Sequence, residues 1–176
     1  MDIVDYIKGS IADAHRFNDI AASELTEEIG LWQPQGTANT IQALVAHMTT
    51  GEDNAIQRAI KAGEKLNEPG AANSSLFMSK GWSAELGIPT ERGGQWTKGW
   101  KLNLPAFQAY RKAVHKETDA WLETLKADDL EREVFWFNGA NTVGGLLRMV
   151  VIHHQLLHSG EISTLKGQQG LKGLPM

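Results

Sequence analysis

Two histidines four residues apart stand in the most apolar stretch of the chain. The apolar residues around His154 and His158 recur at helical spacing: Val143, Leu146, Leu147, Val150, Val151, Leu157, Ile162 and Leu165. Residues four apart share one helix face, with about 5–6 Å between their Cβ atoms, so two imidazoles can bind a single metal ion. The spacing alone is a weak signal. The signal is stronger because both histidines lie on the apolar face of the predicted helix, where polar rings are seldom buried without a partner.

A third histidine, His47, lies on a second predicted helix. At 1.5 Å per residue it stands roughly 10 Å from the start of that helix, and the His154/His158 pair stands roughly 15 Å from the far end of its own. Antiparallel packing would therefore bring the three rings to one level. Three neutral imidazoles and an open fourth position are typical of a catalytic zinc-type site. The alternative is three separate core histidines that bind backbone groups or water.

Carboxylates follow these histidines at short intervals. Glu52 and Asp53 come five and six residues after His47, and Glu161 comes three residues after His158. Such a group can hold the outer N–H of a metal ligand or accept a proton in a reaction. We predict Glu52 and Glu161 as the candidate catalytic residues, although each is more often a charged residue on the border of a helix.

The other histidines have weaker claims. His153 points about 100° away from His154 around the helix, which favours packing over ligation. His15 continues the inner side of the first predicted helix and is a remote candidate for a fourth ligand. His115 is predicted to lie on the solvated surface.

The elements that must position these residues are four amphipathic helices. Periodicity predicts them over residues 2–29, from 39 or 40 to 63, from 103 to 125, and from 142 to about 165. Residues 131–137 favour a short extended piece, and no convincing set of strands occurs. We predict an all-α fold, a four-helix bundle of up-down-down-up order, in a single domain over residues 1–176.

A long crossover separates the second and third helices. Between residues 67 and 103 the helical periodicity disappears, but large apolar side chains remain, among them Trp82, Trp96 and Trp100. A disordered linker would be poor in such residues, so we expect this segment to pack against the bundle. The tryptophans are candidates for the wall of a pocket, although ordinary packing also explains them.

Composition limits the function classes. The net charge is −4 with a pI near 5.9, which argues against nucleic acid or an anionic membrane as a partner. No cysteine occurs, which excludes disulfides and a thiol nucleophile of the chain's own. No apolar run is long enough to span a bilayer, so a cytoplasmic protein is expected. Glu-x-x-His, His-Glu-x-x-His and Walker A motifs are absent.

The chain resembles the DinB/YfiT-like superfamily of metalloenzymes. The matching motifs are Trp32-Gln-Pro34, the run from Asn39 to His47, and His154-x-x-x-His158-Ser-Gly-Glu-Ile162; residues 81–89 are similar to a loop in one branch of the group. The resemblance implies a four-helix bundle of up-down-down-up order and frequent assembly as a homodimer. It also implies a divalent metal, often zinc or nickel, on His47, His154 and His158.

The resemblance further implies chemistry with a low-molecular-weight thiol. Characterised members include S-transferases and isomerases that use bacillithiol or mycothiol, and an external thiol suits a chain without cysteine. Our leading hypothesis is a metal that activates such a thiol, or water, for transfer to or hydrolysis of a small electrophile. The alternative is a non-catalytic stress-response protein that binds a metal or a small ligand. A third is a bundle that only dimerises, with histidines in its core.

Overall fold

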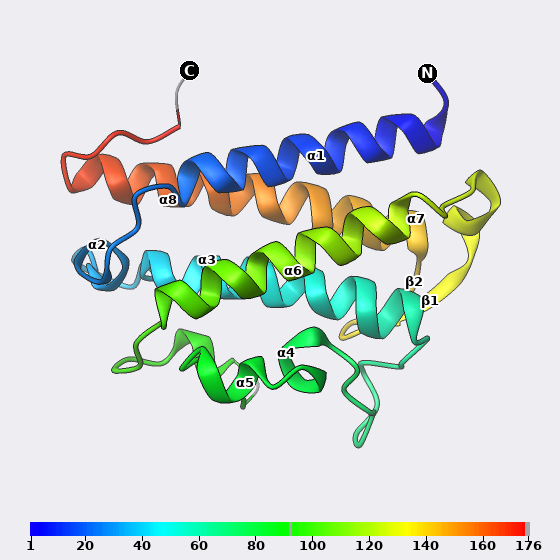
Figure 1. Cartoon of the computed structure of the whole chain (residues 1–176), viewed down its shortest axis with the longest axis horizontal. Coiled ribbons are helices and arrows are strands. Elements are labelled where there is room, and N and C mark those ends of the chain that lie inside the picture. The colour runs from blue at the N-terminus through cyan, green and yellow to red at the C-terminus, as the bar shows by residue number, and fades with distance from the viewer. Residues whose placement is uncertain (92, 175–176) are drawn as a thin grey trace.

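Four long helical segments lie side by side in the computed structural model, which describes residues 1–91 and 93–174 (Figure 1). The first is α1, Ile3–Ala21, and the third is α6, Leu104–Leu122. The second consists of α3, Ile41–Asp53, continued by the π-helix η1, Asn54–Lys61. The fourth consists of α7, Val143–Leu146, the π-helix η4, Leu147–His153, and α8, His154–Gln168. The protein is mostly helical, as predicted.

Side-chain caps begin the last three of these segments where the sequence predicts them. Thr40, Asn103 and Thr142 each accept a hydrogen bond from the backbone N–H three residues further on. Such caps satisfy N–H groups that have no partner within the helix. Pro105 lies in the first turn of α6, where its missing N–H costs nothing.

The predicted first helix is two helices in the structure. After α1 ends at Ala21 the chain turns through Glu24, whose φ is 58°, and the short helix α2, Glu27–Leu31, follows. Thr26 caps α2 by accepting from the Ile29 N–H. The prediction of one helix over 2–29 was therefore wrong after residue 21, because the apolar spacing continues across the break.

A two-stranded hairpin stands between α6 and α7. After the 3₁₀ turn η3, Ala127–Glu131, strand β1, Glu133–Trp136, pairs antiparallel with β2, Gly139–Thr142. The sequence predicted an extended piece here but not the second strand. Gly139, with φ of 115°, takes a conformation that other residues rarely adopt.

The crossover packs against the helices, as expected. It contains α4, Leu76–Ser79, α5, Trp82–Glu85, and the 3₁₀ turn η2, Gly94–Trp96. In Figure 1, α4 and α5 lie beneath α3 and α6. Among its described residues, the larger buried apolar side chains are Leu76, Leu86, Ile88 and Leu102. Asp53 of α3 anchors its start, because its carboxylate accepts the backbone N–H groups of Leu76 and Phe77 at 2.9 and 2.8 Å.

The apolar faces of the long segments enclose the core. One group of buried side chains lies where α1, η1 and η4 meet, and the other lies among α3, α6, α8 and the crossover. In Figure 1, α3 and α6 run in one direction and α1 and α8 in the other. Among the helices described, none has both the length and the apolar character that crossing a membrane would require.

Candidate metal centre

Three histidines from two helices converge at one side of the molecule. The rings of His47 on α3 and of His154 and His158 on α8 each offer a nitrogen, and these nitrogens lie within 4.8 Å of one another. The ring centroids are separated by 4.6 Å for His47–His154, 5.3 Å for His47–His158 and 4.6 Å for His154–His158. The structure therefore brings together the three residues predicted as ligands, which we call the triad.

The ring planes of the triad suit a common ligand. They are inclined to one another by 76°, 78° and 85°. The lone pair of an imidazole nitrogen lies in the plane of its ring. Rings inclined in this way can direct their in-plane lone pairs toward one ion, which parallel stacked rings cannot do.

Charge and hydrogen bonding also fit a metal ion. Burial lowers the pKa of His47 to about 3 and that of His154 to about 4, and the neighbouring imidazoles add to both shifts. These two rings are therefore neutral at pH 7, the form that binds a metal. His154 Nε2 lies 2.7 Å from His47 Nε2, so these two nitrogens face the same point. A divalent ion suits this set of nitrogen donors.

Contacts from two sides hold the triad. His158 Nδ1 lies 2.8 Å from Oε2 of Glu161, one of the two predicted catalytic carboxylates. Such a carboxylate fixes the tautomer and orientation of a ligating imidazole. On the other side Gln95 of η2 reaches to 3.4 Å from His47 Nδ1, and the Trp96 ring lies 4.6 Å from the His47 ring. The sequence did not point to Gln95, because its position depends on the path of the crossover.

Glu52 faces a different part of the molecule. Its fully buried carboxylate binds His15 Nε2 at 3.0 Å, the Thr118 hydroxyl at 2.6 Å and Gln155 Nε2 at 3.0 Å. Within residues 1–91 and 93–174 it makes no hydrogen bond to the triad. Five residues of α-helix turn its side chain about 140° away from His47, whereas three residues bring Glu161 back to the face of His158.

His15, Glu52 and His115 form a second cluster, which we call the Glu52 cluster. The rings of His15 and His115 are stacked, 3.8 Å apart and inclined by only 7°. Parallel planes do not meet, so in this arrangement both rings cannot direct a lone pair at one ion. The expectation of His15 as a fourth ligand therefore finds no support. His115, expected on the surface, is half-buried against His15.

The Glu52 cluster is ionic. Burial works against charge on His15, but the charge and hydrogen bond of Glu52 prevail and raise the pKa of His15. Burial likewise opposes the Glu52 carboxylate, but His15 keeps the pKa of Glu52 below its usual value. Burial lowers the pKa of His115, and charged His15 acts in the same direction. The pKa values of the two stacked imidazoles are thus shifted in opposite directions.

A cavity of about 610 Å³ opens beside the triad. His47 and His154 line one end of it, and the crossover and the hairpin supply most of its apolar wall. Those wall residues are Phe77, Met78, Ile88, Pro89, Trp96, Trp136 and Phe137. Of the three crossover tryptophans considered for a pocket wall, Trp96 alone lines this cavity within the described residues. Trp82 and Trp100 pack against the core.

Comparison with known proteins identifies the family. The model of the DinB superfamily matches residues 14–162, a range that contains all three triad histidines. The chain belongs to the DinB superfamily. Comparison of this DinB-superfamily chain with curated proteins finds no match.

Solved structures of low sequence identity share the fold of this DinB-superfamily chain. A conserved protein from Enterococcus faecalis has a TM-score of 0.71 at 15% identity, and the match covers 94% of this chain and 96% of that one. A DinB-like protein from Bacillus subtilis, YjoA, has a TM-score of 0.63 at 20% identity, with 97% and 96% covered. At these identities the likeness concerns the fold alone.

Proposed function

We propose that this member of the DinB superfamily is a metal-dependent enzyme. In this proposal His47, His154 and His158 hold a zinc or nickel ion, and the enzyme transfers a low-molecular-weight thiol to a small electrophile or hydrolyses that electrophile. The observation that carries the proposal is the convergence of three imidazoles, two of them held neutral, at the end of a 610 Å³ cavity. Neutral imidazole nitrogens are ligands that suit zinc and nickel.

In this proposal the triad binds the metal ion, and Glu161 orients one ligand and accepts a proton. A bound divalent ion lowers the pKa of a thiol or water beside it. His47, His154 and His158 would hold the ion with three ligands, and such sites keep a further position for water or substrate. Glu161 holds His158 Nδ1, so that Nε2 of His158 is left to face the centre, and its half-exposed carboxylate can also accept a proton from the reacting molecule.

The thiol would come from outside the chain. With no cysteine in the sequence, a sulfur nucleophile must be a cofactor such as bacillithiol or mycothiol. The apolar wall made by Phe77, Trp96 and Trp136 would exclude water from the reacting atoms and hold the apolar part of the electrophile.

Assembly and location belong to the same proposal. We propose one domain, a DinB-type four-helix bundle of up-down-down-up order, that works in the cytoplasm as a homodimer on a small-molecule substrate. The outer face of α8 supports dimerisation, because Leu157 is 73% exposed beside the exposed Leu156. The net charge of −4 speaks against nucleic acid or a membrane as the partner.

One observation favours a second candidate, a stress-response protein that binds a metal or small ligand without turnover. Glu52, one of the two predicted catalytic carboxylates, is fully engaged by His15, Thr118 and Gln155. Glu161 then remains the carboxylate in contact with the triad within the described residues. A site with so few free acidic or basic groups can bind a ligand, but it has little means of transferring protons.

Metal analysis of two variants tests the centre. Purified wild-type protein is expected to hold one divalent ion per chain, and His154→Ala is expected to lose it. His153→Ala is the matched control, because His153 is the adjacent, exposed histidine on the same helical segment. Equal metal content in wild type and His154→Ala would overturn the proposed centre.

Thiol-transfer assays separate the two candidate functions. The zinc-loaded and nickel-loaded proteins are supplied with bacillithiol or mycothiol and a panel of small electrophiles. Turnover that His154→Ala abolishes and His153→Ala retains is the expected result. Metal-loaded protein that binds the thiol and consumes no electrophile would favour the binding protein.

A further inference from the structure

One face of a single helix forms the floor of the cavity. His47, Thr50, Gly51, Asn54 and Arg58 all line it, and they follow one another at intervals of three, one, three and four residues. Such intervals place side chains on the same side of a helix. The floor therefore runs along α3 into η1, and Arg58 lies roughly 15 Å along the axis from His47.

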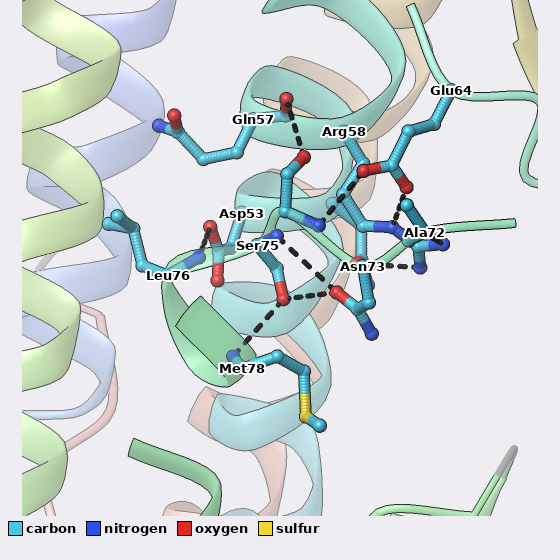
Figure 2. Close-up of polar contacts among 11 residues, drawn as sticks. Asp53, Gln57, Arg58, Glu64, Ala72, Asn73, Ser75, Leu76 and Met78 are labelled. Carbon is cyan, nitrogen blue, oxygen red and sulfur yellow. Dashed lines mark hydrogen bonds and ion pairs between the residues drawn. The ribbon is translucent and has the colours of Figure 1, made fainter. Parts of the chain in front are cut away.

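Arg58 is held firmly at the far end of this floor (Figure 2). Its Nε donates to Glu64 at 2.6 Å and its Nη2 donates to the Ala72 carbonyl at 2.8 Å. Nη1 reaches Asn54 Oδ1 at 3.4 Å. A guanidinium has five N–H groups, so two of them have no partner among the residues described. Glu64 also accepts from the Ser74 N–H and, within the described residues, is not part of the cavity lining.

The acceptor atoms at this end are already used. Asn73 Oδ1 accepts from the backbone N–H of Ser75 at 3.3 Å and from its hydroxyl at 2.6 Å. The Ser75 hydroxyl in turn accepts from the Met78 N–H (Figure 2). The amide nitrogens of Asn54 and Asn73 have no hydrogen-bond partner in the described part of the chain. This end therefore presents donors to the cavity: two N–H groups of Arg58 and the amide groups of Asn54 and Asn73.

We propose that the cavity binds an elongated small molecule with a carboxylate at the end away from the triad. The carboxylate would lie on Arg58, Asn54 and Asn73, and the apolar body would pass between Phe77 and Trp96. This inference rests on the proposed function for the other end, where the reactive group meets the triad.

The charges at this end favour a monoanion. A guanidinium and two amides offer the planar, directed donors that a carboxylate accepts. Glu64 keeps the guanidinium in place and offsets its charge, while Glu91 adds negative charge to the lining. The negative charge of Glu64 and Glu91 would repel a dianion such as a phosphate monoester more strongly than a single carboxylate, which gains the hydrogen bonds with less repulsion.

A series of thiol acids tests the proposal on the holoprotein. The protein is loaded with cobalt, and binding is followed by the thiolate-to-metal absorption band. The probes are mercaptobutanoic, mercaptohexanoic and mercaptoundecanoic acids, which are too long to chelate the ion in a five-membered ring, each compared with the mercapto alcohol of equal length. The acid is expected to bind about tenfold to a hundredfold more tightly than the alcohol at one long chain length and equally at the shortest, since hydrogen bonds to a charged group strengthen binding by that order.

Asn73→Asp is the diagnostic variant. It keeps the oxygen that binds Ser75, and it replaces the donor amide with an anionic oxygen. The long thiol acid is expected to lose its about tenfold or larger advantage, while the alcohols bind as before. Asn67→Asp adds the same charge to an exposed position of the crossover and is the matched control. Arg58→Gln is a poorer choice, because it would leave Glu64 without its ion-pair partner.

The outcomes separate this inference from the proposed function. Absence of an absorption band with every thiol would count against the metal-thiol chemistry. A band for every thiol, with acids and alcohols equal at all lengths, would overturn the carboxylate site and leave the proposed function intact. An identical response of Asn73→Asp and Asn67→Asp would also overturn the carboxylate site.

Discussion

The triad and the Glu52 cluster have similar components and opposite geometry. Each brings together three side chains of the types that bind metal ions, with ligand atoms within 4.8 Å of one another. The triad rings are steeply inclined, two of them are held neutral, and they border a cavity. The rings of the Glu52 cluster are parallel, and the cluster is closed by an ion pair. The two clusters contain similar residue types. The inclination of their rings, and whether their polar atoms are already paired with one another, separate a candidate metal centre from a structural cluster.

Glu52 and its hydrogen-bond partners join all four long helical segments. His15 comes from α1, Glu52 from α3, Thr118 from α6 and Gln155 from α8, and Glu52 bonds the other three. Gln155 also donates to the Met48 carbonyl at 3.3 Å. Because Gln155 adjoins His154 and Met48 adjoins His47, this network sets the register of the two helices that carry the triad.

The variant Glu52→Ala is the strongest test of the difference between the Glu52 cluster and the triad. Removal of the carboxylate leaves His15, Thr118 and Gln155 without their partner, and the loss of one member of a buried pair typically costs about 3–5 kcal/mol. Urea denaturation of the metal-free protein measures this loss. Glu161→Ala is the control at the triad, where the carboxylate is 37% exposed and the expected loss is below about 1 kcal/mol. Equal losses would contradict the division between the two clusters.

The pH dependence of stability tests whether His15 and Glu52 form an ion pair. His15 has a raised pKa in the folded protein, so its charge stabilises below its unfolded pKa of 6.5, and that stabilisation is lost as pH rises through the folded value. Glu52 has a lowered pKa, so its contribution is complete above 4.5 and is lost as pH falls through the folded value.

The free energy of unfolding of the metal-free wild type should therefore exceed that of Glu52→Gln by the largest amount between pH 4.5 and 6.5. Urea midpoints of both proteins across a pH series give the difference curve, in which groups common to both cancel. A flat difference curve would show that His15 and Glu52 do not form an ion pair in solution.

Glu161→Gln tests the triad from its outer side. The amide keeps the shape of the side chain but holds His158 Nδ1 more weakly, and loss of such a contact typically reduces metal affinity about 10- to 100-fold. Competition with a chromophoric chelator measures the affinity. The fold stability of the metal-free variant should match that of wild type. An unchanged affinity would remove Glu161 from the centre.

Gly51→Ala has the smallest expected effect. A Cβ at Gly51 would lie 3.6 Å from His154 Cε1, an ordinary contact, and alanine favours an interior helical position by up to about 1 kcal/mol. Gly160→Ala on α8 is the matched control, since no atom lies within 4 Å of a Cβ there. Thermal denaturation should show similar gains for both variants. A loss of stability with Gly51→Ala alone would mean that His154 needs the space.

Local signals in the sequence predicted most of the helical frame. Thr40, Asn103 and Thr142 are strong caps, and the apolar periodicity after each of them is long, so three helix starts could be placed from the sequence. The break after Ala21 was missed because apolar residues keep their spacing across it. Strand β2 was missed because Gly139 and Asn141 have little preference for strands, and its pairing depends on β1.

The candidate site was predictable to the extent that it follows helix periodicity. His154 and His158 share a face by their spacing, and Glu161 joins them for the same reason. The partner of Glu52 could not be predicted, because His15 lies 37 residues away and the contact depends on how α1 rotates against α3. Gln95 reaches the cavity through the path of the crossover, for which the sequence contains no periodic signal.

The contact of Trp96 with His47 makes the centre open to optical study. Trp96 is 38% exposed and its ring lies 4.6 Å from the imidazole, the one contact between a tryptophan ring and a histidine ring within the described residues. Its emission will therefore respond to events at His47, and paramagnetic ions such as nickel or cobalt will quench it. Occupancy of the centre can thus be followed by titration in dilute solution, with the difference between wild type and Trp96→Phe isolating this one fluorophore.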